Sequence, residues 1–238
     1  MFAGPNGSGK STIKSVLSPE LIGVYVNPDE IQLQVANNGM LDFANYQIAI
    51  SQEEVRRHFL SSTLAARCGL TELPTGFSVK EQQLFVPSAM SDSYVASILA
   101  DFLRQKLLRQ GVSFTFETVM SSPDKIEFLD QAQRAGFRTY LYYVATEDPA
   151  INIWRVKRRV ELGGHNVPHE KIIARYNRSL ALLIDAIRRS DRAYLFDNSG
   201  AAPVWIAEIT SGKEIQIKSD VLPNWFKAAV WDKLPSSH

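Results

Sequence analysis

The chain is nearly devoid of cysteine, since Cys68 is the single one among 238 residues. An internal disulfide is therefore excluded, and nothing points to an oxidising compartment. Long apolar runs are missing too, because none reaches the ~20 residues that span a bilayer. The first residues already belong to a binding motif, so we expect no secretory signal peptide. These absences predict a soluble, cytoplasmic protein with no membrane partner.

The chain also lacks an excess of charge of either sign. Its 26 basic and 25 acidic residues argue against a broad nucleic-acid surface, although a local basic cluster stays compatible with them. No internal repeat or low-complexity linker is present. With 45% hydrophobic residues, a chain of this length can bury one substantial core. We therefore expect a single domain over residues 1–238.

The strongest motif stands at the start of the sequence. The stretch from Gly4 to Ser11 fits G-x-x-x-x-G-K-[ST], the loop that holds the phosphates of nucleoside triphosphates. Its glycines let the backbone turn and aim N–H groups at phosphate oxygens, Lys10 would reach the β and γ phosphates, and the Ser11 hydroxyl would ligate Mg²⁺. The motif predicts binding of ATP or GTP with Mg²⁺ by Gly4, Gly7, Ser8, Gly9, Lys10, Ser11 and Thr12. Only three residues precede it, so the strand that should lead into the loop is very short or the sequence begins inside it.

Apolar runs alternate with segments of helical periodicity along the chain. This order predicts an α/β fold of the P-loop NTPase type, with a parallel sheet flanked by helices. The candidate strands are residues 23–27, 112–117, 139–145 and 192–197, and the main helical segments are 91–111, 121–136, 147–164 and 167–191. After Pro203, two short β-like runs around Gly212 predict a C-terminal β-hairpin, and residues 222–234 predict a short amphipathic helix. Residues 59–90 give mixed signals and are interpreted as an insertion or flap beside the site.

Two acidic residues follow candidate strands. Ligands of open α/β sheets gather at the carboxyl ends of the strands, so Asp29 is a candidate proton acceptor or Mg²⁺ partner; equally, it is a candidate N-cap of the helix beginning near Glu30. Glu117, followed by Thr118, ends a very apolar strand. Because an unpaired carboxylate is costly to bury, Glu117 should face a wet crevice and bind a donor there, such as a sugar hydroxyl, or pair with an arginine of the fold.

Helical residues 151–190 form the most basic part of the chain. Arginines of a closing segment can stabilise the charge of a phosphoryl group in transfer, so we expect an Arg-rich helical lid at about residues 149–190. Arg175 and Arg178 lie three residues apart and share a helix face, and the glycines before His165 suggest a hinge. Most of these charges belong to solvated helix faces, and two or three should touch nucleotide. His165 is interpreted as a loop or hinge contact.

No apparatus for a motor or switch ATPase stands out. The apolar run of residues 139–145 is followed by Glu147 and Asp148, which lie beyond it and suit the N-cap of the next helix. The order of phosphate loop, acid after the second strand and Arg-rich helices instead suits a kinase that transfers phosphate to a small molecule.

Taken together, these motifs resemble those of the zeta-toxin family of P-loop kinases. The matching stretches are AGPNGSGKST, VNPDEI, FETVMS, RVKRRVELGGHNVP, IIARYNRSL and FDNS, which follow the family order over most of the chain. The resemblance implies an ATP- or GTP-dependent kinase that phosphorylates a hydroxyl of a UDP-amino sugar, typically UDP-N-acetylglucosamine. It also implies a toxin that a small helical antitoxin holds in check.

The resemblance assigns roles to individual residues. Lys10 and Ser11 keep the phosphate and metal roles, and Asp29 matches the catalytic base. Glu117 and Thr118 match the acid and hydroxyl that bind the sugar. Arg159 and Arg175 fall where family members place arginines on the γ-phosphate, with Arg158 or Arg178 as substitutes.

Two other functions remain open at the level of sequence. One is a P-loop kinase with a different acceptor, such as a nucleoside, an antibiotic or a polynucleotide end, the last disfavoured by the near-neutral charge. The other is a nucleotide-gated binding protein whose lid closes on ATP to present a surface to a partner.

Overall fold

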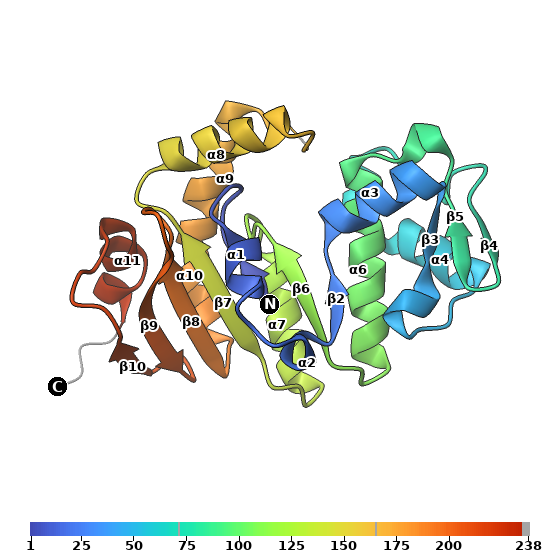
Figure 1. The fold of residues 1–238 in the computed structure, drawn as a ribbon. Coiled ribbons are helices and arrows are strands. Elements are labelled where there is room, and N and C mark those ends of the chain that lie inside the picture. The colour runs from blue at the N-terminus through green and yellow to red at the C-terminus, as the bar shows by residue number, and fades with distance from the viewer. Residues whose placement is uncertain (71, 165, 235–238) are drawn as a thin grey trace. The chain divides into compact units, whose positions relative to one another are not determined.

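The structure is a computed structural model that describes residues 1–70, 72–164 and 166–234 (Figure 1). The chain divides into two compact units, one formed by residues 1–18 and 117–238 and the other by residues 19–116. The single kinase domain expected over residues 1–238 stays a prediction. Within the described ranges, no helix has the length and apolar character needed to cross a membrane.

The first unit is built on a mostly parallel sheet with the strand order β10-β9-β8-β7-β1-β6. Strands β8, β7, β1 and β6 run parallel, whereas β9 and β10 form an antiparallel edge. Its elements are β1 (Phe2–Ala3), α1 (Lys10–Lys14), the end of β6 (Phe114–Thr118), α7 (Asp124–Arg134), β7 (Tyr140–Ala145), α8 (Pro149–Glu161), α9 (His169–Ala181), α10 (Leu183–Arg188), β8 (Arg192–Asp197), β9 (Val204–Thr210), β10 (Glu214–Ile217), α11 (Asn224–Ala229) and the 3-10 turn η3 (Trp231–Lys233).

Strand β1 has only two residues, yet it lies inside this sheet, between β7 and β6. Phe2 pairs with Glu117 of β6 on one side and with Tyr142 of β7 on the other. Both residues of β1 are buried, and the Phe2 and Tyr142 rings stack with centroids 5.1 Å apart. In Figure 1, α8 and α9 lie beyond the carboxyl ends of β7 and β8, and α10 lies behind the sheet. The short strand thus delivers the loop that follows it to the ligand-binding edge of an α/β sheet.

The structure confirms the predicted fold class. The four candidate strands correspond to β2, β6, β7 and β8, and the predicted C-terminal hairpin is formed by β9 and β10. The short amphipathic helix is α11, whose Trp225 and Phe226 are buried. The basic helices are α8 and α9, and His165 between them lies outside the described residues.

The second unit combines helices with short strands. Strand β2 pairs in parallel with the first three residues of β6, and the order β3-β5-β4 makes a separate antiparallel sheet. Its elements are α2 (Pro19–Ile22), β2 (Val24–Val26), α3 (Pro28–Asn38), β3 (Met40–Asp42), η1 (Phe43–Tyr46), α4 (Gln52–Ser61), α5 (Thr63–Arg67), β4 (Ser78–Lys80), β5 (Gln83–Phe85), η2 (Ser88–Met90) and α6 (Ser93–Arg109). Residues 59–90, predicted as an insertion, supply most of this small sheet.

Helix α6 forms the core of the second unit. The Asp92 carboxylate caps its first turn, and Gly111 with φ +70° follows its end, a conformation that glycine adopts without strain. An apolar stripe formed by Val95, Ile98, Leu99, Phe102 and Leu103 is buried. The Phe102 ring packs edge-on against Phe43 with centroids 5.8 Å apart. Burial of this stripe, rather than helix propensity alone, holds α6 in place.

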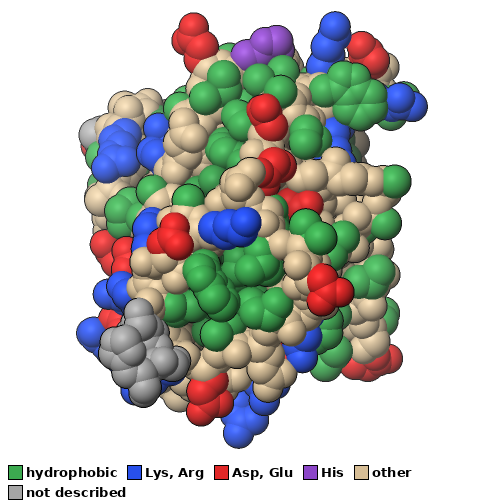
Figure 2. Space-filling view, turned by 90° about the vertical axis from the view of Figure 1, so that its left-hand side faces the viewer, with side chains coloured by type: hydrophobic (Ala, Val, Ile, Leu, Met, Phe, Trp, Pro, Cys, Tyr) green, Lys and Arg blue, Asp and Glu red, His purple; other side chains and the backbone are tan. Residues whose placement is uncertain are grey.

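Apolar side chains also reach the surface of the first unit. Figure 2 shows hydrophobic side chains gathered on the face that lies at the left of Figure 1, the side of β9, β10 and α11. Large exposed side chains after β8 include Trp205, Val221 and Trp231. Trp205 continues a row of rings across the sheet, because Tyr142 stacks on Tyr194 and Tyr194 lies against Trp205. Such cross-strand ring pairs stabilise a sheet.

Candidate active site

The loop of residues 4–11 leaves β1 and wraps toward the start of α1. Its three glycines all have positive φ, at +144° for Gly4, +76° for Gly7 and +96° for Gly9. Gly9 directly precedes α1 and adopts the left-handed conformation there. A residue with a Cβ would be strained at each of these positions. The backbone therefore takes the tight path that the motif predicts.

These glycines also allow close approach to three neighbouring segments. A Cβ would lie 2.1 Å from the Val144 carbonyl oxygen at Gly4, 2.6 Å from the Asn152 carbonyl oxygen at Gly7, and 2.0 Å from the Asn198 Nδ2 at Gly9. The three neighbours belong to β7, to α8 and to the segment after β8. The glycines therefore serve two purposes, because they allow the backbone to turn and also allow it to pack closely against these segments.

Lys10 lies near the end of the loop, as the first residue of α1, and is 7% exposed. Its Nζ donates hydrogen bonds to the carbonyl oxygens of Gly4 at 3.0 Å and Pro5 at 3.2 Å. The same Nζ lies 3.7 Å from Oε1 of Glu117, at the end of β6. The ion pair places the predicted phosphate-binding lysine and the predicted acceptor-binding acid at one point of the sheet edge.

Three hydroxyl groups of the loop differ in their surroundings. Ser8 is fully buried, and its Oγ has no hydrogen-bond partner within the described ranges. A buried hydroxyl without a partner is costly, so the site suits an anionic ligand that would accept a hydrogen bond from it. Ser11 and Thr12, in the first turn of α1, are exposed. The Ser11 hydroxyl is thereby accessible to a metal ion bound with a polyphosphate.

Two buried asparagines that the sequence interpretation did not single out hold the loop. Asn198 donates from Nδ2 to the Ser8 carbonyl oxygen at 2.8 Å, and Asn152 donates from Nδ2 to the Asn6 carbonyl oxygen at 2.7 Å. Asn198 follows β8, in the FDNS stretch. Its place directly after a candidate strand could have marked it as a site residue in the sequence. Asn152 lies inside α8, and a polar residue within a helix does not by itself indicate a site residue.

Helix α9 is fastened to the end of β7. Tyr176 donates its hydroxyl hydrogen to the Thr146 carbonyl oxygen at 2.6 Å, and burial raises the pKa of Tyr176 to about 12. The phenol therefore stays protonated and remains a donor over the physiological pH range. Tyr143 of β7 and Ser179 of α9 share a further buried hydrogen bond at 3.0 Å. Helix α9 is thus fixed at the strand that neighbours β1.

The predicted arginines occupy different positions. Arg175 donates from Nη1 to Oδ1 of Asn6 at 3.2 Å, so it contacts the phosphate loop. Arg178 donates from Nε to the Ser121 carbonyl oxygen at 3.2 Å, after β6. Arg159 is exposed near the end of α8. The structure thus brings Arg175 to the loop, whereas Arg178 binds the backbone of a neighbouring segment.

Thr118 shapes the turn that leaves β6. Its Oγ1 accepts a hydrogen bond from the Met120 backbone N–H at 3.0 Å. Met120 is buried and has φ +53°, a conformation that costs free energy for a residue with a side chain. Such strain concentrates at functional sites, and here it sets the direction of the chain just after Glu117.

Asp29 belongs to the second unit, in the first turn of α3. The alternative that Asp29 caps this helix is wrong, because the helix begins at Pro28 and its N-cap is Asn27. The Asn27 Oδ1 accepts the Asp29 backbone N–H at 2.9 Å, which leaves the Asp29 carboxylate exposed at the helix start. The side chain is therefore accessible to a ligand.

Of the two acids after β7, Asp148 caps the next helix, as the sequence suggested, whereas Glu147 binds a segment distant in the chain. Asp148 is the N-cap of α8, where its Oδ1 accepts the Ala150 N–H at 2.7 Å. The Glu147 carboxylate instead accepts the Asn224 backbone N–H at the start of α11. No group of three or more His, Cys, Asp or Glu side chains able to hold a metal occurs in the part of the chain that is described.

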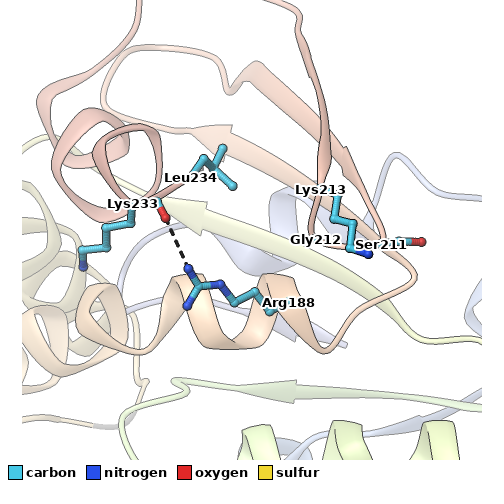
Figure 3. Close-up of a pocket in the computed structure, with 6 residues that line it drawn as sticks. All are labelled: Arg188, Ser211, Gly212, Lys213, Lys233 and Leu234. Carbon is cyan, nitrogen blue, oxygen red and sulfur yellow. Dashed lines mark hydrogen bonds between the residues drawn. The ribbon is translucent and has the colours of Figure 1, made fainter. Parts of the chain in front are cut away.

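A separate hollow of about 460 Å³ lies at the opposite edge of the sheet from the phosphate loop (Figure 3). It is lined by Arg188, Ser211, Gly212, Lys213, Lys233 and Leu234. The Arg188 guanidinium donates to the Lys233 carbonyl oxygen at 3.2 Å, which ties α10 to the C-terminal turn. Since this hollow contains none of the loop residues, it is distinct from the candidate active site.

The parallel sheet and the glycine loop at its carboxyl edge define an α/β protein of the P-loop type. Residues 91–207 match the family model described as Zeta toxin. A Haemophilus influenzae protein described as uncharacterized is 30% identical over 69 residues, which span 29% of this chain and 49% of that protein. The match thus extends over about half the length of that relative.

Two solved structures share the fold. The AvrRxo1-ORF1:AvrRxo1-ORF2 structure with sulphate ions has a TM-score of 0.56 at 16% identity, covering 100% of this chain and 65% of that chain. The AvrRxo1-ORF1:-ORF2 structure with ATP has a TM-score of 0.54 at 17% identity, covering 98% of this chain and 62% of that chain. At this level of identity the likeness establishes the architecture.

Proposed function

We propose that this protein is a kinase that transfers the γ-phosphate of ATP or GTP to a hydroxyl group of a small molecule. The observation that carries the proposal is the position of Lys10, buried in a glycine loop and 3.7 Å from Glu117. In this proposal Lys10 binds phosphate, and the Glu117 carboxylate accepts a hydrogen bond from the acceptor hydroxyl, at the same edge of the sheet. The structure of a protein with the same fold, solved with ATP, supports the nucleotide.

The proposed reaction assigns one task to each group. The acceptor oxygen bonds to the γ-phosphorus, the bond from this phosphorus to the β,γ-bridging oxygen breaks, and the acceptor proton passes to Asp29. Lys10 binds the β and γ phosphates, and Arg175, with Arg159 and Arg178 from the same basic helices, neutralises charge on the moving group. Ser11 would hold Mg²⁺, which supplies charge neutralisation on the phosphates when bound.

The acceptor that fits the family is a UDP-amino sugar, typically UDP-N-acetylglucosamine. Glu117 and Thr118 would bind its hydroxyl groups, because both side chains lie at the end of β6 beside the loop strand. We further propose that the protein acts in the cytoplasm as the toxin of a toxin–antitoxin pair and has a small helical antitoxin as partner. The match to the zeta-toxin family supports this role.

The test is a transfer assay with Mg²⁺-ATP, or Mg²⁺-GTP, and a panel of UDP-sugars, nucleosides and water, followed by mass spectrometry of each acceptor. We expect UDP-N-acetylglucosamine to gain one phosphate. Lys10→Ala should abolish the gain, whereas Lys14→Ala, at the other end of α1, should retain it.

Other outcomes would separate the alternatives. Phosphate on a nucleoside alone would keep the kinase and replace the acceptor. ADP production that no acceptor accelerates, together with a partner complex that forms only with ATP, would overturn the kinase in favour of a nucleotide-gated binding protein.

A further inference from the structure

Two buried asparagines contact the phosphate loop from the side of the protein interior. From their geometry we infer that Asn152 and Asn198 are positioning residues that fix the direction of two peptide groups in the loop for binding triphosphate. This inference rests on the proposed function, because it concerns how the same loop holds its nucleotide.

The direction of a peptide group follows from the position of its carbonyl oxygen. In a planar trans peptide the carbonyl oxygen and the N–H of the next residue point to opposite sides. The Asn198 amide holds the Ser8 carbonyl oxygen, so the N–H of Gly9 points away from Asn198. By the same argument, the Asn152 amide holds the Asn6 carbonyl oxygen, and the N–H of Gly7 points away from Asn152. Backbone N–H groups turned in this way are the donors that such a loop offers to phosphate.

Each asparagine is itself held in place. The Asn198 backbone N–H donates to the Ala145 carbonyl oxygen at 2.8 Å, and its own carbonyl oxygen accepts from Nη1 of Arg155 at 2.7 Å. The Asn152 Oδ1 accepts the hydroxyl hydrogen of Thr146. Because the amide oxygen is engaged there, the NH₂ group must face the loop. The fold therefore sets the orientation of the Asn152 amide and fixes the backbone of Asn198 before any ligand arrives.

Burial makes these hydrogen bonds consequential. Asn152 is 0% exposed and Asn198 is 7% exposed, so water cannot easily replace a lost amide donor. A buried carbonyl oxygen left without a donor would favour rotation of its peptide group toward another donor, and the following N–H would turn with it. The glycines permit the contact, since a Cβ at Gly9 would lie 2.0 Å from the Asn198 amide nitrogen.

The experiment is calorimetric titration of Mg²⁺-ATP into the full chain, which reports the dissociation constant and the bound stoichiometry separately. Asn152→Ala and Asn198→Ala should each weaken ATP binding about tenfold, as expected for the loss of one buried hydrogen bond. The matched control is Asn177→Ala, an exposed asparagine on α9, which should change the dissociation constant less than about twofold.

The separation of affinity from stoichiometry distinguishes positioning from stability. A variant that only unfolds in part would bind fewer equivalents of ATP with an unchanged dissociation constant, and this result for both alanine variants would overturn the inference. If neither variant folds, the milder variants Thr146→Val and Arg155→Gln decide, because each removes one hydrogen-bond partner of an asparagine and leaves the asparagine itself in place. Unchanged affinity in both would also overturn it.

The wild-type titration separates this inference from the proposal on which it rests. Wild-type protein that binds no ATP or GTP would refute the proposed function itself. Wild-type protein that binds ATP normally, beside asparagine variants that bind equally well, would refute the positioning role and leave the kinase standing.

Discussion

The ammonium group of Lys10 and the carboxylate of Glu117 lie 3.7 Å apart, with 8% and 17% of their side chains exposed. Lys10 comes from the loop after β1, and Glu117 ends β6, the strand beside β1. A pair this close and this shielded from water interacts more strongly than a surface ion pair. The pair links the residue proposed to bind phosphate to the residue proposed to bind the acceptor. A substitution at either residue should therefore affect nucleotide binding and acceptor binding differently.

Replacement of Glu117 should separate acceptor binding from nucleotide binding. We expect Glu117→Gln to raise the KM for the acceptor about tenfold, because a charge-assisted hydrogen bond becomes a neutral one. The dissociation constant for ATP should not rise, since Lys10 keeps its hydrogen bonds to the loop carbonyls. Steady-state kinetics and ATP titration check both values. The control is Glu127→Gln, an exposed acid on α7, and weakened ATP binding with an unchanged acceptor KM would contradict the assignment.

Arg175 should contribute mainly to the rate of transfer. Its guanidinium contacts Asn6 of the phosphate loop, where the proposed reaction would develop charge on the moving phosphoryl group. We expect Arg175→Gln to lower kcat about 10³-fold, the lower end of the range for such arginines. Lys171→Gln, an exposed cation one turn earlier on α9, provides the control in the same assay. A kcat lowered equally by both variants would point to the general charge of α9 instead.

Asp29 should be needed for transfer but not for nucleotide binding. With Asn27 as the helix cap, Asp29→Asn removes a proton acceptor without removing the cap. We expect transfer to fall about 10²- to 10⁴-fold while ATP binds with unchanged affinity, as for loss of a general base. Glu30→Gln, the exposed neighbour in the same turn, should retain activity. Full transfer by the Asp29 variant would remove this residue from the mechanism.

His58 should make the second unit sensitive to acid. Burial of the ring is the main cause that lowers the pKa of His58, and the positive charges of Arg104 and Arg109 lower it further. The Asp101 carboxylate, 3.6 Å away, and a hydrogen bond to the Ile98 backbone act in the opposite direction and raise it. The folded state therefore favours the neutral ring, so its stabilising contribution is complete above pH ~6.5 and is lost as the pH falls toward the folded pKa.

The corresponding measurement is the urea midpoint of unfolding at several pH values below 7, with hydrogen exchange in α6 as a local probe. Stability should fall by at most about 1.4 kcal/mol per pH unit from this one group. His58→Gln should flatten the dependence, whereas His169→Gln, an exposed histidine on α9, should leave it unchanged. Equal pH dependence in all three proteins would show that His58 does not carry the effect.

Sequence alone predicted the architecture of the P-loop sheet because the signals are local. The alternation of apolar strands and amphipathic helices, and the glycines that stop them, depends on neighbours in the chain, and the predicted strands and hairpin agree with β2, β6, β7, β8, β9 and β10. The phosphate loop could likewise be predicted, since all the residues of its motif lie within one short stretch of the sequence.

The sequence could not decide between the two interpretations of Asp29, because both fit an acid before a helix. Only the structure showed that Asn27 is the cap, which depends on where the helix starts to within one residue. The ion pair of Glu117 with Lys10 was equally hidden, since the two residues are far apart in the chain and meet through parallel pairing of β1 and β6.

By itself, then, the sequence determined the main strands and helices around the P-loop sheet, the glycine loop and the class of protein. The tertiary structure decided how the loop is held, because Asn152 and Asn198 reach it from segments more than a hundred residues away. It also placed Arg175 against Asn6 and Arg178 against the Ser121 carbonyl, although the two arginines share one helix. Local patterns fix what a segment becomes, whereas the partners of a buried amide or a guanidinium depend on which distant segments the sheet brings together.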